Sequence, residues 1–198
     1  EVSVRELATT AGMNVAAVNY HFQGKENLFH EVISRRFTAQ RDRTLGGLKV
    51  LLDQSGGKPR VEDVIRVLVS EYMDGALSNS FLTIVTRDLH TANAETLSRF
   101  FKEMIQPLYA AFSAALTAAR PSLRPDELNW IIASIIGQMH HFILRRIKYA
   151  CFENESEVRQ MMTASFPALE LEHDEYVSQV TDHIARFSAA AIVGMYPE

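Results

Sequence analysis

Apolar residues recur three and four residues apart along nearly the whole chain, a spacing that places them on one face of a helix. No stretch alternates apolar and polar residues as a half-buried strand does. We therefore predict an all-α protein of about nine helices. The predicted ranges are about 4–12, 15–21, 25–52, from 61 onward, 80–90, 94–119, 125–151, a short helix and loop within 153–172, and 174–194.

The first two predicted helices are short and carry clear end signals. Ser3 and Glu6 have the spacing of a capping box, in which each residue satisfies a backbone amide of the other. Gly12 tolerates a positive φ and ends the first helix, and Asn14 can cap the second. Two short helices joined by a glycine-containing turn are typical of a helix-turn-helix, whose second helix enters the major groove of DNA.

The residues of this segment sharpen that interpretation. The stretch AxxAGMNxxxVNYHFQGKENLF resembles the signature of the TetR family of transcriptional regulators. The resemblance rests on Ala8, Ala11, Gly12, Tyr20, His21, Phe22, Lys25, Glu26 and Leu28. It implies a helix-turn-helix domain over residues 1–46 and a larger helical ligand-binding and dimerisation domain over 47–198. The segment TRDLHTANAETLSRFFKEMIQPLYAAF faintly resembles the CecR-like branch of the family.

The resemblance also implies which residues contact DNA. Residues expected to face the groove are Asn14, Val15, Ala16, Ala17 and Asn19. Asn19 can pair bidentately with adenine, and the alanine methyls can touch thymine methyls. The family pattern assigns phosphate contacts to Tyr20, His21 and Lys25, joined by Ser3 and Arg5 of the preceding helix. Hydroxyl, imidazole and ammonium groups donate to phosphate oxygens without reading sequence. The competing interpretation of Tyr20 and His21 is packing at a helix end.

Two features weaken a DNA-binding interpretation. The net charge is −4, although residues 1–46 hold six Lys and Arg against five Asp and Glu, so the acidity lies elsewhere. Members of the family usually have another helix before the capping box. We expect that first helix to be missing from this chain, which would leave Leu7, Val18 and Phe22 without a packing partner.

Two places within the longer helices disfavour a regular helix. Gly46 and Gly47 weaken a helix by about 1 kcal/mol each relative to alanine, which makes a bend or an end possible within the helix predicted over about 25–52. Pro107 removes a backbone hydrogen bond within 94–119, which predicts a kink near Met104.

Bulky side chains of the middle helices are candidates for a largely apolar effector pocket with a few polar groups. For each residue taken singly, core packing is the more frequent explanation. The candidates are Met73, Phe81, Phe101, Met104, Tyr109, Phe112, Trp130, Met139 and His141.

The helices at about 125–151 and 174–194 are the expected dimer surface. The apolar face of the first is too wide for one neighbouring helix, and the second carries a narrow seam spaced three and four. Paired with their symmetry mates, they would form a four-helix bundle. The alternative is that both only close the core of the monomer.

Other chemistry finds little support in the sequence. His140 and His141 point about 100° apart on a helix, so they cannot chelate one metal together. Cys151 is the single cysteine and forms no internal disulfide. No phosphate loop, nucleophile elbow or paired carboxylates indicate an enzyme, and no cofactor is expected. Without a signal segment or a membrane-spanning apolar run, a cytoplasmic location is expected.

These observations favour a homodimeric, ligand-responsive DNA-binding regulator. We expect a repressor that binds a palindromic double-stranded DNA operator and is released by a largely apolar small molecule. The alternatives are a helical ligand-binding or scaffolding module without DNA binding, and a metal or redox sensor on the same frame.

Overall fold

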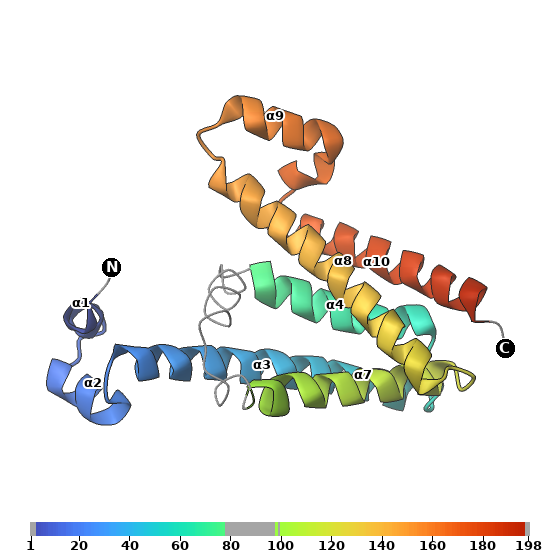
Figure 1. Cartoon of the computed structure of the whole chain (residues 1–198), viewed down its shortest axis with the longest axis horizontal. Helices are drawn as coiled ribbons and strands as arrows, with labels where there is room; N and C mark the ends of the chain where they lie inside the picture. Colours follow the sequence, from blue (N-terminus) through green and yellow to red (C-terminus); the bar gives the residue numbers. More distant parts are fainter. Residues whose placement is uncertain (1–2, 78–97, 99, 197–198) are drawn as a thin grey trace. The chain divides into compact units, whose positions relative to one another are not determined.

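The computed structural model describes residues 3–77, 98 and 100–196, and every regular element in them is helical. The predicted all-α fold class is therefore confirmed. The elements are α1 (Val4–Thr10), α2 (Val15–Phe22), α3 (Lys25–Gln54), α4 (Val61–Leu77), the π-helix η1 (Phe101–Ile105), α7 (Gln106–Ala119), α8 (Pro125–Cys151), α9 (Ser156–Ser165), the 3-10 helix η2 (Pro167–Glu170) and α10 (His173–Met195) (Figure 1). The predicted helix at 80–90 and the start of the 94–119 helix lie outside the described residues.

The chain divides into two compact units, residues 1–39 and 40–198. In the first unit, the caps of α1 follow directly from the sequence. The Glu6 backbone N–H donates to Ser3 Oγ at 3.2 Å, and the Ser3 N–H donates to the Glu6 carboxylate at 2.7 Å. The predicted capping box is confirmed. At the other end, Gly12 has φ +64° and the Met13 N–H donates to the Ala8 carbonyl at 2.8 Å, which forms a Schellman turn.

The long helix α3 runs through both glycines at positions 46 and 47 without ending. The single helix predicted over about 25–52 is confirmed, and the end that the two glycines made possible does not occur. At least one of the glycines serves packing. A β-carbon on Gly47 would lie 2.9 Å from Cγ1 of Val67 in α4. A β-carbon on Gly75 of α4 would likewise collide with the Gln40 side chain of α3. The two helices approach each other closely at both places.

Proline 107 acts on the helix geometry just before it. Residues Phe101–Ile105 form the π-helix η1, and α7 begins at Gln106 with the proline in its first turn. The Gln106 N–H donates to the Phe101 carbonyl, five residues back. A π-turn accommodates the lost i to i−4 hydrogen bond, so at the place where a kink was predicted the helix changes type.

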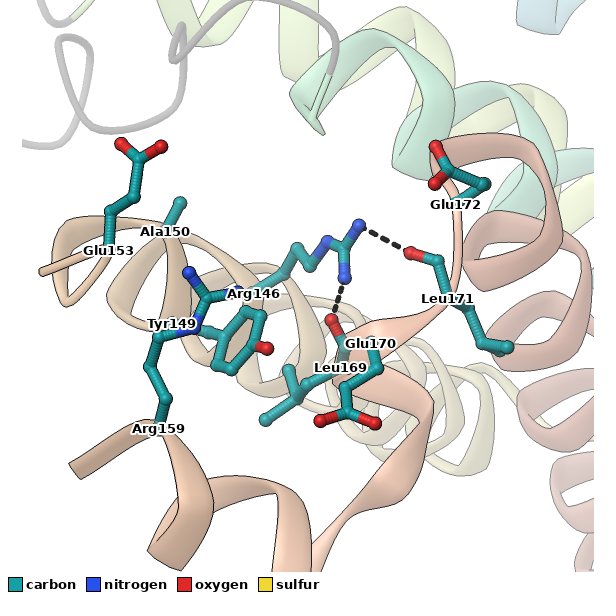
Figure 2. A pocket seen from close by; sticks show the side chains of 9 residues that line it. All are labelled: Arg146, Tyr149, Ala150, Glu153, Arg159, Leu169, Glu170, Leu171 and Glu172. Atoms are coloured by element: carbon teal, nitrogen blue, oxygen red, sulfur yellow. Dashed lines mark hydrogen bonds between the residues drawn. The ribbon is translucent and has the colours of Figure 1, made fainter. Parts of the chain in front are cut away.

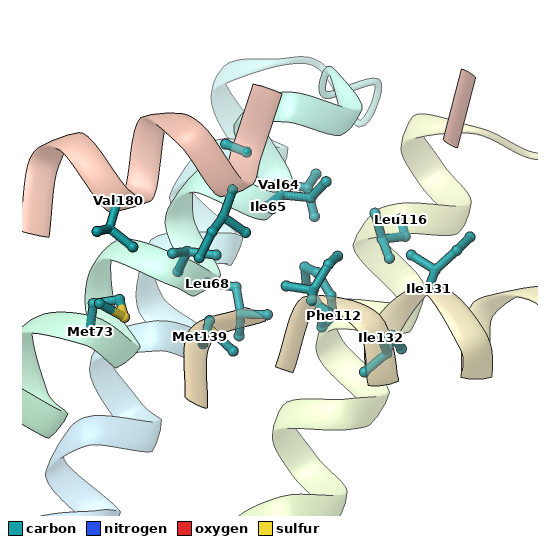
Figure 3. Packing of buried hydrophobic residues seen from close by; sticks show 14 of the residues in the cluster. Val64, Ile65, Leu68, Met73, Phe112, Leu116, Ile131, Ile132, Met139 and Val180 are labelled. Carbon is teal, nitrogen blue, oxygen red and sulfur yellow. The ribbon is translucent and has the colours of Figure 1, made fainter. Parts of the chain in front are cut away.

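The hydrophobic core of the second unit lies between α4, α7, α8 and α10, with Leu48 of α3 added (Figure 3). Helix α10 packs along α4, and α8 crosses α4 (Figure 1). Arg66 of α4 reinforces the first contact through an ion pair of 2.8 Å to Asp182 of α10. The buried Tyr176 hydroxyl donates to the Phe142 carbonyl at 2.8 Å and joins α10 to α8.

The C-terminal elements agree closely with the sequence prediction. Helix α8 spans 125–151 as predicted, and α10 spans 173–195 instead of 174–194. Between them, α9 and η2 form the expected short helix and irregular segment, with Pro167 at the start of η2.

Candidate nucleic-acid interface

Helix α2 presents one buried and one exposed face. Asn14 caps it by accepting a hydrogen bond from the Ala16 N–H at 2.8 Å, and Val18 is buried. Asn19, Tyr20 and His21 are exposed, and Tyr20 is 82% exposed. A phenol so accessible at the end of a helix is free to contact another macromolecule.

The exposed face of α2 contains four residues at helical spacing. Ala16, Asn19, Tyr20 and Gln23 are three, four and seven residues apart, and all are exposed. Val15 and Ala17 are half-buried, so two of the five residues expected to face the groove are only partly accessible. Gln23 was not among the candidates, although its spacing from Ala16 was readable in the sequence.

The end of α2 uses an uncommon backbone conformation. Gln23 has φ +56° and its N–H donates to the Asn19 carbonyl at 2.8 Å. Gly24 follows with φ +132°, a value available essentially to glycine alone. Lys25 then begins α3, so a positive side chain stands at the start of a helix directly after the exposed face.

Arg5 is the exposed cationic donor of α1. Ser3 Oγ, at the cap of this helix, accepts from the Glu6 amide, and its hydroxyl lies beside the Glu6 carboxylate. In the same way the Asn14 Oδ1 is used by the cap while its NH₂ group is not. Hydrogen bonds from the Ser3 backbone and side chain lower the pKa of Glu6, so that carboxylate stays ionised beside these donors.

The predicted effector residues separate into three groups. Met73, Phe112 and Met139 are packed in the core of the second unit. Phe101, Tyr109, Trp130 and His141 are exposed. Phe81 and the Met104 side chain lie outside what the structure describes. The described part of the chain thus brings only the first three together, in close packing.

Helices α8 and α10 expose large apolar residues away from this core. Trp130 and Leu144 lie on α8, and Phe187 and Val193 lie on α10. An open groove of about 970 Å³ runs between the start of α4 and the second half of α10. Its apolar lining includes Phe187, Ala190 and Val193.

The described residues hold no group of three or more His, Cys, Asp or Glu side chains placed to bind a metal ion. None of their helices combines the length and the apolar character that crossing a membrane requires.

Comparison with known proteins gives one result. No curated protein and no solved structure matches the chain. The resemblance noted in the sequence is nevertheless supported over the N-terminal segment, because residues 1–32, which contain α1 and α2, match the family described as bacterial regulatory proteins, tetR family.

Proposed function

We propose that this protein is a DNA-binding transcriptional regulator that reads its operator with α2. The observation that carries the proposal is the exposed face of Ala16, Asn19, Tyr20 and Gln23 within a segment that matches the tetR family. The major groove admits a helix, and Asn and Gln amides can each pair bidentately with adenine. This face therefore supplies base readout.

The groups that flank this face fix the position and orientation of the protein on the DNA duplex. The groups assigned to phosphate contacts are Ser3 at the cap of α1, Arg5 within it, Tyr20 and His21 near the end of α2, and Lys25 at the start of α3. Asn14 joins them, since its carbonyl oxygen is occupied by the helix cap and its NH₂ group remains a donor. Val15 and Ala17 contribute mainly to packing.

DNA selection followed by titration tests the proposal. The chain is incubated with randomised duplex DNA, the bound fraction is sequenced, and the enriched duplex is titrated by fluorescence anisotropy at two salt concentrations. We expect one enriched motif, with affinity that falls steeply as salt rises because phosphate contacts release counterions. Enrichment of no motif, with equal affinity for scrambled DNA, would overturn the proposal and favour the module without DNA binding.

We further propose that the regulator is a homodimer through α8 and α10. Trp130, Leu144, Phe187 and Val193 expose apolar surface on these two helices, and the groove beside α10 offers room for side chains of a second copy. A symmetric dimer places two α2 helices on a palindromic operator with half-sites about 34 Å apart. The enriched motif should therefore be an inverted repeat.

Release by a small molecule completes the proposal. A largely apolar effector bound in the 40–198 unit would favour the conformation that binds DNA less well, and this difference in affinity sets the response. Repression follows if the operator overlaps a promoter. The test is a panel of apolar compounds added to the protein bound to its selected duplex, in which at least one compound should lower DNA affinity.

A further inference from the structure

A pocket of about 550 Å³ lies where the end of α8, α9, η2 and the start of α10 meet (Figure 2). It shares no residue with the proposed DNA-binding face or with the predicted effector positions. Its polar lining consists of Arg146, Tyr149, Glu153, Arg159, Glu170 and Glu172.

Arg146 builds the wall of this pocket. Its guanidinium donates to the carbonyls of Leu169 and Leu171, the latter at 2.7 Å, and lies 4.9 Å from the centre of the Tyr176 ring. Figure 2 shows both hydrogen bonds reaching from α8 to the segment before α10. These two hydrogen bonds hold Arg146 against the segment before α10, so its side chain fixes the shape of the pocket wall.

Tyr149 lies beside this wall and is buried, with 7% of its surface exposed. Among the described residues, nothing forms a hydrogen bond with its hydroxyl. The hydroxyl oxygen is not one of the described buried side-chain atoms that lack a partner, so it is accessible from the pocket. The Tyr149 hydroxyl can therefore form a hydrogen bond with a molecule bound in the pocket.

Arg159 of α9 covers the Tyr149 ring, with its guanidinium carbon 4.1 Å from the ring centre (Figure 2). It makes no ion pair with any described carboxylate. A guanidinium that lies over an aromatic ring can still present N–H donors at its edge, and two such donors match a carboxylate in a bidentate geometry.

Three glutamates complete the lining. Glu153, Glu170 and Glu172 are exposed, form no ion pair with the described residues, and lie on different sides of Tyr149 (Figure 2). These glutamates lie too far apart to bind a single metal ion, in agreement with the absence of a metal-binding group among the described residues. Each of them can instead pair with a separate ammonium group. With two arginines against three glutamates, the lining carries a net charge of −1.

We propose that this pocket binds a basic amino acid, a zwitterion with one carboxylate and two amino groups. The carboxylate of the ligand accepts hydrogen bonds from the edge of the Arg159 guanidinium and from the Tyr149 hydroxyl. Its protonated amino groups form ion pairs with the glutamates. The ligand charge of +1 complements the lining. This site is independent of the proposed DNA binding, because none of its residues belongs to the 1–39 unit.

Calorimetric titration of the chain with L-lysine tests the proposal. Two partial probes separate its parts: 1,5-diaminopentane has only the amino groups, and glutarate has only carboxylates. We expect lysine to bind at least about tenfold more tightly than either probe, since charge-assisted hydrogen bonds are the strong ones. Binding of the diamine equal to that of lysine, or no lysine binding at millimolar concentration, would overturn the proposal.

Variants locate the binding. Arg159→Gln should weaken lysine binding about tenfold or more, and Tyr149→Phe about threefold to tenfold through loss of one hydrogen bond. Arg60→Gln, an exposed arginine outside the pocket, is the matched control and should bind lysine like the parent. Each variant is checked by its thermal unfolding midpoint. Equal affinity of Arg159→Gln and Arg60→Gln would place lysine elsewhere and refute the assignment.

Discussion

Gly47 in α3 faces Cγ1 of Val67 in α4 so closely that an added β-carbon would stand 2.9 Å from it. The neighbouring Gly46 differs, since a β-carbon there would meet no atom within 4 Å. Two adjacent glycines in one helix therefore have opposite roles. One permits two helices to approach, and the other only lowers helix propensity.

Alanine at these two positions should have opposite effects on stability. Gly46→Ala should raise the free energy of unfolding by up to about 1 kcal/mol through helix propensity. Gly47→Ala gains the same propensity but forces the stiff, β-branched Val67 aside, and overpacking typically costs about 1–3 kcal/mol. Urea unfolding of both variants measures the difference. Equal stabilisation by the two alanines would show that Val67 yields without cost.

The accuracy of the sequence prediction depended on how local each signal was. The Ser3–Glu6 capping box and the bounds of α8 were predictable because their determinants are adjacent in the chain. Gly47 was misjudged because its partner, Val67, is twenty residues away. Met73, Phe112 and Met139 could not be distinguished from pocket residues, since both roles call for bulky apolar side chains.

The same limit applies to the candidate sites. Gln23 belongs to the exposed face of α2 by simple spacing and could have been found. The pocket beside Tyr149 could not, because it depends on Arg146 reaching the carbonyls that follow α9. Only the fold brings those groups together.

The Tyr72–His140 contact should make stability depend on pH. Tyr72 Oη lies 3.0 Å from His140 Nε2, and burial raises the pKa of Tyr72 to about 12, so the phenol donates. Burial also lowers the pKa of His140 below its usual 6.5. The unfolded chain therefore binds a proton more readily than the folded one, and this contribution to stability falls as pH drops below about 6.5.

Unfolding of the parent and of His140→Gln at pH 7.5 and pH 5 checks this dependence. The parent should lose more of its free energy of unfolding between the two pH values than the variant does. The comparison removes the titration of all other groups, which both chains share. An identical loss in both would show that His140 does not contribute.

Substitutions on the proposed DNA-binding face should separate positioning from readout. Arg5→Ala should weaken binding to all duplexes alike and reduce the salt dependence by about one phosphate contact. Asn19→Ala should instead change sequence preference, with about 1–3 kcal/mol lost at one base pair. Both side chains are exposed, so stability should change little.

Anisotropy titrations with the selected duplex and with single-base variants of it measure both effects. A uniform loss on every duplex from Asn19→Ala would contradict its role in readout.

A charge on the exposed face of α10 should abolish the proposed dimer. Phe187 is 60% exposed and stacks on His183 with ring centres 5.9 Å apart, so Phe187→Glu should be tolerated in a monomer. In a dimer the glutamate would be buried opposite its symmetry mate without a partner, which is strongly unfavourable.

Met161→Glu on α9 is the matched control, since Met161 is 70% exposed and lies outside the α8 and α10 faces. Sedimentation equilibrium should report dimers for the parent and the control and monomers for Phe187→Glu. Dimers in all three proteins would exclude this face of α10 as the interface.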